Sequence, residues 1–390
     1  MFQPGFDTAA FLRDYWQKKP LLIRGGGAAW RNPIDPDDLA GLAGEDGVEA
    51  RIVTRTKKTW KLEHGPFKAS RFAKPGKKPW TLLVQAVDQA VPEVAALIEP
   101  FRFVPNWRID DVMVSYATDG GGVGPHFDQY DVFLIQGLGR RRWQVGGRCD
   151  ATTALLPHDD LRLLADFVPT DEWVLEPGDM LYVPPGIAHD GVAVGDDCMT
   201  YSIGFRAPSR AELVSNWCDH LLDGLADDDR YADPGLGLQG NPGEIAPDAI
   251  ARLHAMVTET LLDRDAFARW FGEYSSVPKN ADVDWSPAKP VDPGALRTAL
   301  AGGAVLRRNP ASRFAFVRRG DGRIGESIVL FVDGRSFDCG GEARVFAEML
   351  CANDSVAPGM FADAPIALIA TLIDQGSISL DELRRPMMRL

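Results

Sequence analysis

Cysteine is scarce in this chain of 390 residues, and its spacing excludes several classes of protein. The five cysteines are scattered and form no Cys-x-x-Cys pair; they are Cys149, Cys198, Cys218, Cys339 and Cys351. An odd number of widely separated cysteines argues against a disulfide framework and against a zinc cluster. Reduced thiols are typical of the cytoplasm, so we expect a cytoplasmic protein.

Long apolar runs and basic charge are also in short supply. The sequence lacks a run of about 18 uncharged apolar residues, so we expect no membrane-spanning helix. Its first residues lack a basic segment followed by an apolar one, so we expect no secretory signal. The formal net charge of −13 disfavours general nucleic-acid binding.

One segment, residues 51–80, opposes this acidic balance. It contains a single acid, Glu63, and two interleaved tryptophans, Trp60 and Trp80. Its ten basic residues are Arg51, Arg55, Lys57, Lys58, Lys61, Lys68, Arg71, Lys74, Lys77 and Lys78. Two interpretations stay open, a solvated and mobile surface insert or a docking patch for nucleic acid or an acidic partner. Any contact with nucleic acid is expected only through this segment.

Two histidines and one aspartate form the most informative pattern in the chain. His126 and Asp128 lie two residues apart in the segment GPHFDQY, and His189 ends the later segment PPGIAH. Residues two apart in an extended backbone point to the same side, so His126 and Asp128 could face one metal. Two imidazoles and a carboxylate form the open ligand set of non-haem Fe(II) oxygenases. The sequence therefore predicts an oxygen-activating iron enzyme with these three residues as ligands.

A second His-x-Asp sequence, which begins at His158, is interpreted differently. The apolar residues of 161–167 have helical spacing, so Asp159 or Asp160 is expected to cap a helix and His158 to lie on the surface. The first motif differs in its context, because a flexible glycine-rich approach at 120–124 precedes it and an apolar strand at 131–136 follows it.

The patterning along the chain predicts a mainly β domain followed by helical segments. A helix at 7–19 and a strand at 21–24 precede short β-rich runs broken by Gly, Pro and Asp, which indicate a β-sandwich or jelly roll. Ser209 and Glu212 form a capping box that opens a helix, and a second helical run lies near 247–272.

The C-terminal part has a different texture. A linker rich in Pro and Asp leads to a hairpin that turns at Asp333 and Gly334, and helices are expected near 342–352 and 364–375. This order indicates a winged-helix-like module. The predicted domains are a catalytic domain (1–208), a helical region (209–275), a linker (276–294) and the C-terminal module (295–390).

The helical region carries more apolar side chains than two connecting helices should leave in water. They are Leu213, Trp217, Leu221, Leu222, Leu253, Met256, Val257 and Leu261. A self-complementary patch is most simply buried against a second copy, so we expect a homodimer.

With these motifs in place, the chain resembles the JmjC-type 2-oxoglutarate oxygenases of the cupin superfamily, and within them the bacterial ribosomal protein arginine hydroxylases. The resemblance rests on FxxxYWxxKPLLIR from Phe11, GGVGPHFDQYDVF from Gly121, QGxGRRRW from Gln136 and YSIGFRAP from Tyr201. It implies a double-stranded β-helix, or jelly-roll, catalytic domain with a helical dimerisation region and a winged-helix tail. It also implies hydroxylation of the β-carbon of an arginine in a large-subunit ribosomal protein, with Fe(II), 2-oxoglutarate and O2.

The distal carboxylate of 2-oxoglutarate needs a cation, and a bidentate arginine supplies it best. Strand alternation places Arg140 and Arg142 on one face and Arg141 alone on the other. The resemblance also places the co-substrate base at Arg141. Ser115 and Ser202, on neighbouring strands, are candidate hydroxyl partners.

An arginine substrate needs an acid and an aromatic wall beside the iron. Asp111, Met113 and Tyr130 fit by residue type and by their match to the substrate pocket of the family. Two other enzyme classes stay open, a JmjC histidyl hydroxylase and a methyl-lysine demethylase acting on another basic protein. A metal-binding cupin scaffold without oxygenase activity is the alternative from a different class.

Overall fold

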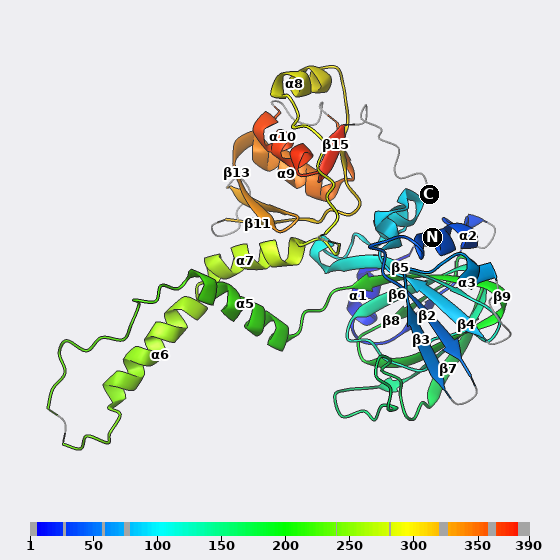
Figure 1. Cartoon of the computed structure of the whole chain (residues 1–390), viewed down its shortest axis with the longest axis horizontal. Coiled ribbons are helices and arrows are strands. Elements are labelled where there is room, and N and C mark those ends of the chain that lie inside the picture. The colour runs from blue at the N-terminus through cyan, green and yellow to red at the C-terminus, as the bar shows by residue number, and fades with distance from the viewer. Residues whose placement is uncertain are drawn as a thin grey trace.

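The fold comes from a computed structural model, which describes residues 6–25, 29–56, 59–73, 79–238, 240–280, 282–319, 327–357 and 364–380. Figure 1 shows a β domain on the right, a smaller mixed domain above it, and helices that extend to the left. Among the described helices, none is both long enough and apolar enough to cross a bilayer.

As far as the structure describes it, the β domain is a nine-stranded antiparallel sheet that curls on itself. Its strand order is β1-β8-β6-β9-β5-β4-β2-β3, and β7 pairs with β6 outside this path. The strands are β1 (Leu21–Ile23), β2 (Ala50–Arg55), β3 (Trp60–His64), β4 (Trp80–Val84), β5 (Ile109–Ala117), β6 (Asp131–Arg148), β7 (Pro169–Leu175), β8 (Met180–Val183) and β9 (Ile187–Phe205).

Two long strands, β6 and β9, build both layers of the domain. The first half of β6 pairs with β8 and the end of β9, and its second half pairs with β7 and the start of β9. The register of β6 against β9 shifts between Gln136 and Arg140, where Gly139 has a φ of 56° that favours glycine. The bend at this point turns one strand pair into two layers. The predicted jelly roll is confirmed.

The two faces of β6 bury different sets of side chains. Phe133 and Ile135 point to an outer core, which is closed by Phe11 of helix α1 (Thr8–Asp14). Val132 and Leu134 point inward, where they meet Trp143, Val145, Leu175, Leu181, Val183 and Ile187. This period of two is what strands buried on both faces require. The functional site described below lies on the inner face.

Helix α1 is shorter than the predicted helix at 7–19. Asp7 caps it by accepting a hydrogen bond from the amide of Ala10. The helix ends at Asp14, and the following turn holds Gln17 at a φ of 58°. The amide of Gln17 donates to the hydroxyl of Tyr182 at 2.7 Å, so a tertiary contact stops the helix before Pro20.

The basic segment 51–80 is part of the main sheet. β2 pairs with both β3 and β4, and β4 continues to β5, so the interpretation as a mobile insert is wrong for these strands. The single acid, Glu63, lies 3.1 Å from Arg71 and 3.8 Å from Lys61. Five of its lysines lie outside the described residues; they are Lys57, Lys58, Lys74, Lys77 and Lys78.

The helical region begins with α5 (Arg210–Gly224), and its capping box between Ser209 and Glu212 is present as predicted. The run predicted near 247–272 is two helices, α6 (Pro247–Leu261) and α7 (Arg264–Ser276). The break lies at Asp263, whose carboxylate accepts hydrogen bonds from the amides that open α7. The apolar pattern continues through 247–272, so the sequence did not reveal the cap at Asp263.

In its described residues, the C-terminal domain combines two three-stranded sheets with three helices. The Asp333-Gly334 turn has both residues in the left-handed region, as the predicted tight hairpin requires. The elements are α8 (Pro293–Ala301), β10 (Leu306–Arg308), β11 (Phe314–Arg318), β12 (Ile328–Val332), β13 (Arg335–Cys339), α9 (Gly341–Ala352), β14 (Ser355–Val356), α10 (Ile366–Asp374) and β15 (Ile378–Leu380).

Helix α7 packs against the sheet β11-β12-β13, although its sequence falls in the helical region predicted at 209–275. A Cβ added at Gly272 would overlap the ring of Phe331 on β12, so the helix approaches this strand closely. The C-terminal domain also contacts the jelly roll directly: Arg102 pairs with Asp354 at 2.6 Å and Arg313 pairs with Asp110 at 3.0 Å.

Candidate metal and substrate site

The backbones of His126 and His189 bring the two imidazoles together. The amide of His126 donates to the carbonyl of His189 at 3.0 Å, and the amide of His189 donates back at 2.8 Å. The amide of Gly186 donates to the carbonyl of Asp128 at 2.7 Å, so residues 126–128 run alongside the start of β9. This short ladder places the two segments in antiparallel register.

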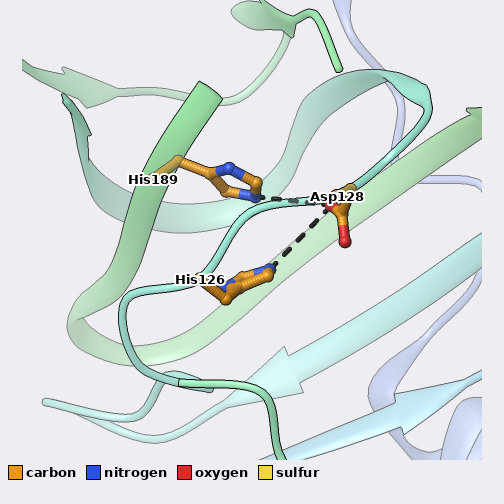
Figure 2. A group of neighbouring side chains, drawn as sticks. All are labelled: His126, Asp128 and His189. Atoms are coloured by element: carbon orange, nitrogen blue, oxygen red, sulfur yellow. Dashed lines mark ion pairs between the residues drawn. The ribbon is translucent and has the colours of Figure 1, made fainter. Parts of the chain in front are cut away.

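Figure 2 shows His126, Asp128 and His189 converging on one point. Oδ2 of Asp128 lies 4.0 Å from Nε2 of His126 and 3.6 Å from Nε2 of His189. The three ligand atoms all lie within 4.8 Å of one another. Two imidazole nitrogens and one carboxylate oxygen at such separations form a set that could hold a transition-metal ion and leave other positions open.

Hydrogen bonds to the backbone set the tautomer of both imidazoles. Nδ1 of His126 lies 2.8 Å from the carbonyl of Gly124, and Nδ1 of His189 lies 3.0 Å from the carbonyl of Ile187. A carbonyl only accepts, so each Nδ1 carries the proton and each neutral ring presents the lone pair of Nε2. Burial, with the neighbouring His126, lowers the pKa of His189 to about 4, which keeps this ring neutral.

Two turns position the segment that carries His189. The amide of Asp179 donates to the carbonyl of Glu176, with Gly178 at a φ of 91° between them. In the second turn the amide of Ile187 donates to the carbonyl of Pro184, and Gly186 has a φ of 74°. Both turns have proline before a glycine with positive φ, the residue types that such turns favour.

The glycine-rich approach to His126 is packed against β9, although a flexible segment was expected from the sequence. The amide of Gly120 donates to the carbonyl of Ala193, and the amide of Ala193 donates to the carbonyl of Gly121. A Cβ at Gly122 would overlap the carbonyl of Gly191. Glycine here permits a close approach of two backbones, and this packing fixes the position of His126.

Arg141 points into the jelly roll beside this group. Arg140 is exposed and Arg142 is half-buried near Glu172, whereas Arg141 is 4% exposed, which is the alternation expected from the sequence. Nη1 of Arg141 donates to the carbonyl of Gly191 at 3.4 Å. Its Nε and Nη2 are buried without a hydrogen-bond partner among the described residues. A buried guanidinium with unsatisfied donors fits an anionic ligand.

Other side chains of the inner face line the same interior. Trp143 contacts Arg141, with its ring 5.7 Å from the guanidinium carbon, and lies 5.9 Å from the ring of His189. Ser115 is buried on β5, opposite Thr200 of β9, and donates to the carbonyl of Thr200 at 3.4 Å. Ser202 is paired with Met113 and is also buried. Trp143 is not among the site residues predicted from the sequence.

The three predicted substrate residues lie together at one edge of this interior. A Cβ added at Gly204 would lie 3.9 Å from Oδ1 of Asp111 and 4.0 Å from the ring of Tyr130. Met113 is half-buried two residues after Asp111 on β5. Partial burial, together with the carboxylates of Asp128 and Asp111, raises the pKa of Tyr130. Because Asp128 is one of the three metal-ligand residues, its effect on Tyr130 indicates that this edge lies next to the metal-ligand group.

Asp111 already has a cationic neighbour that was not predicted from the sequence. Nζ of Lys279 lies 2.8 Å from Oδ2 of Asp111 and 3.3 Å from Oδ2 of Asp110. Lys279 follows α7, far along the chain, within the segment predicted as a linker. No local pattern in the sequence connects these residues. Only the docking of the C-terminal domain brings them together.

The structure contradicts the helix predicted after His158. Residues 161–163 form no helix, and Leu155 forms an isolated bridge with Leu164. Nδ1 of His158 accepts hydrogen bonds from the amides of Asp160 and Leu161, so the imidazole closes a loop. The leucine spacing reflects burial instead: Leu163 is 2% exposed and lies against Gly124, next to the site.

Two family models match the chain. A model described as a JmjC domain matches residues 96–213, and one described as a ROXA-like winged helix matches residues 259–379. The first match contains His126, Asp128 and His189, and the second contains α7 and the C-terminal sheets. The predicted winged-helix-like module is confirmed.

Known proteins resemble this chain over almost its whole length. It is 38% identical over 372 residues to the ribosomal protein uL16 3-hydroxylase of Escherichia coli (strain K12), covering 94% of this chain and 95% of that protein. An X-ray structure of Escherichia coli YcfD is 36% identical, with a TM-score of 0.87, and covers 97% of this chain and 100% of that one. The structure of YcfD, a ribosomal oxygenase, in complex with cobalt and 2-oxoglutarate has a TM-score of 0.83 at 36% identity, covering 98% and 100% of the two chains.

Proposed function

The chain belongs to the JmjC family of ribosomal oxygenases, and from this premise we propose that it hydroxylates the β-carbon of an arginine in a large-subunit ribosomal protein, using Fe(II), 2-oxoglutarate and O2. The named substrate of its Escherichia coli relative is the ribosomal protein uL16. We take uL16 as the substrate of this chain too.

The observation that carries the proposal is the state of Arg141. Its guanidinium is buried in the jelly roll, and two of its nitrogens lack a hydrogen-bond partner in the described part of the chain. A buried cation with unpaired donors is costly unless a ligand completes it. The distal carboxylate of 2-oxoglutarate fits, since its planar oxygens match the fork of an arginine.

The residues of this site divide the work by their chemistry. His126, Asp128 and His189 would hold Fe(II) through Nε2, a carboxylate oxygen and Nε2. Bound iron supplies the oxygen chemistry, which consumes O2 and 2-oxoglutarate and yields succinate, carbon dioxide and the hydroxylated side chain. Arg141 would hold the distal carboxylate of the co-substrate, and the hydroxyls of Ser115 and Ser202 lie on the same inner face.

The substrate arginine would enter at the edge formed by Asp111, Met113 and Tyr130. Asp111 offers a carboxylate to the guanidinium, and the ring of Tyr130 gives it an aromatic wall. Tyr130 follows Asp128 by two residues, so a side chain seated there lies beside the metal-ligand group. The protein contributes position and orientation rather than acid–base chemistry.

The helices α5 and α6 support a homodimer. They project from the two domains in Figure 1, and α6 has no buried residue in the single chain. Their exposed apolar side chains include Val214, Leu222, Ile250, Leu253, Met256, Val257 and Leu261. A two-fold interface would remove this surface from water, as closed assemblies commonly do.

The proposed substrate also bears on the cellular location of the protein and on its contact with nucleic acid. A ribosomal protein substrate implies action in the cytoplasm, where ribosomal subunits are assembled. Contact with ribosomal RNA would fall on β2 and β3, which carry Arg51, Arg55 and the exposed Lys61. The net charge of −13 disfavours such contact elsewhere on the chain.

Mass spectrometry of ribosomal proteins tests the proposal. The purified protein is incubated with Fe(II), 2-oxoglutarate and ribosomal extract, and peptides are searched for the mass of one added oxygen atom. We expect the oxygen on the β-carbon of an arginine of uL16. Oxygen on a histidine, or loss of methyl groups from a lysine, would favour another JmjC activity. No modification with the metal bound would favour a scaffold.

A further inference from the structure

The four carboxylate oxygens of Asp110 and Asp111 differ in the number of hydrogen bonds that they accept. Oδ1 of Asp110 accepts from Arg206 at 3.1 Å and from Arg313 at 3.0 Å, and its Oδ2 accepts from Lys279 at 3.3 Å. Oδ2 of Asp111 accepts from the amide of Ala86 and from Lys279, both at 2.8 Å. Oδ1 of Asp111 receives no hydrogen bond from the part of the chain that the structure describes.

The free oxygen faces the substrate edge. Oδ1 of Asp111 lies 3.9 Å from where a Cβ on Gly204 would be, and the ring of Tyr130 lies 4.0 Å from the same point. Glycine at this position leaves room that any larger residue would fill. The side chain of Asp111 is itself 6% exposed, so its charge is screened little by water.

We propose that Lys279 is a positioning residue of the substrate pocket: by holding Oδ2 of Asp111 it leaves one oxygen, Oδ1, oriented to receive the guanidinium of an arginine. This inference rests on the proposed function. It means that the pocket is completed by a residue from outside the jelly roll. The guanidinium then binds through one carboxylate oxygen rather than two, beside the ring of Tyr130.

The charge state of the pair supports this geometry. Burial raises the pKa of Asp111, and Lys279 acts against this rise. Burial acts to lower the pKa of Lys279, but Asp111 and Asp110 outweigh it and raise the pKa. The ammonium group therefore stays charged, and it favours the ionised form of the carboxylate that a cationic substrate needs.

The test compares Lys279→Met with Arg313→Met, measuring hydroxylation of the uL16 peptide that contains the modified arginine. Arg313 is a matched control, because it also joins the C-terminal domain to Asp110, and within the described structure it donates no hydrogen bond to the carboxylate of Asp111. For Lys279→Met we expect the KM for the peptide to rise by about ten-fold, the range of one hydrogen bond to a charged group. The kcat and the KM for the co-substrate should change little, and Arg313→Met should leave all three near wild type.

Two further variants separate positioning from folding. Lys279→Arg keeps the charge and should recover most of the peptide affinity. Lys279→Gln keeps a donor for Asp111, folds with less risk than the methionine, and should raise the KM in the same direction. In the wild type, replacing the arginine of the peptide by citrulline, its neutral analogue, should weaken binding. The same replacement should weaken binding less in Lys279→Met, because this variant no longer presents an oriented charge to the guanidinium.

The outcomes are distinct. A fall in the peptide KM in Lys279→Met would overturn the inference, since it would show that the ammonium group competes with the substrate. An unchanged KM, or an equal rise in Arg313→Met, would overturn it in favour of a purely structural contact. Wild-type protein that hydroxylates no arginine would instead overturn the proposed function itself.

Discussion

His126 and His189 exchange both of their backbone hydrogen bonds, at 3.0 and 2.8 Å. This pairing fixes the distance between two imidazoles from segments far apart in the chain, and their ring centroids lie 4.3 Å apart. The side chains of such a pair project to the same side of the ladder. The metal-ligand geometry is therefore set by the backbone, before any metal binds.

The first prediction concerns this group. His126→Ala or Asp128→Ala should abolish turnover and weaken Fe(II) binding, because two remaining ligands hold the ion poorly. His158→Ala is the control: its imidazole accepts hydrogen bonds from its own loop, so turnover should persist with some loss of stability. Succinate formation and calorimetric titration with a divalent metal measure the two effects. Full activity in either of the first two variants would remove the iron assignment.

The second prediction concerns the co-substrate, 2-oxoglutarate. Arg141→Ala should raise its KM by roughly ten- to a hundred-fold, since a hydrogen-bonded charge contributes about 1.5–3 kcal/mol. Metal binding should survive, because Arg141 is not among the ligand atoms. Arg140→Ala removes an exposed arginine next to it and serves as the matched control. If Arg140→Ala changes the KM and Arg141→Ala does not, the co-substrate is held by a different base.

Local chemistry explains what the sequence could predict. The cap at Ser209, the turn at Asp333 and the inward direction of Arg141 each depend on residues only a few positions apart. For the β domain, the sequence predicted the class of fold, a β-sandwich or jelly roll, but not the pairing of β6 with β9. The site residues came from a motif and a family resemblance, and the roles of Arg141, Ser115 and Ser202 stay predictions.

Tertiary contacts explain what the sequence could not predict. Leucines at helical spacing near 161–164 bury against the mouth of the jelly roll instead of forming a helix. The basic run at 51–80 looked mobile because no local pattern shows that β2 pairs with β4. Lys279 was hidden for the same reason, since its partner Asp111 lies on a strand of the other domain. In all three cases, burial and long-range pairing determine the structure, and the local sequence pattern does not.

The third prediction uses two glycines in helices. Gly272→Ala should destabilise the protein by about 1–3 kcal/mol, because its Cβ would overlap Phe331 where α7 packs on β12. Gly41→Ala is the control in α2 (Pro36–Leu42), where a Cβ meets nothing within 4 Å. It should stabilise by about 0.4–1 kcal/mol. Urea unfolding measures both, and an unaffected Gly272→Ala would contradict the close packing of α7.

The fourth prediction tests the dimer. The wild-type protein should sediment at twice its chain mass of 42.6 kDa, with or without iron. Leu253→Asp places a charge on the exposed apolar face of α6 and should shift the protein to monomer. Glu259→Lys, on another side of the same helix, changes charge without touching that face and should leave the dimer intact. A wild-type monomer at micromolar concentration would refute the proposed interface.

The fifth prediction is a dependence of stability on pH through Asp88. This carboxyl is 5% exposed, and burial raises its pKa to about 7, while its Oδ1 accepts a hydrogen bond from the amide of Val112. The unfolded chain has the ordinary value of 3.8, so the folded protein binds the extra proton between about pH 4 and 7. Stability from this group is therefore fully present below about pH 4 and is lost progressively as the pH rises to about 7.

Asp88→Asn keeps the acceptor for Val112 and removes the charge. The variant should match the wild type at about pH 3, below the unfolded pKa of 3.8, where Asp88 is mostly protonated in both states of the chain, and should be the more stable of the two near pH 8. Thermal unfolding across this range measures the difference. A gap between the two proteins that stays constant with pH would show that the pKa of Asp88 is the same in the folded and unfolded chain, and that nearby Lys279 offsets the effect of burial.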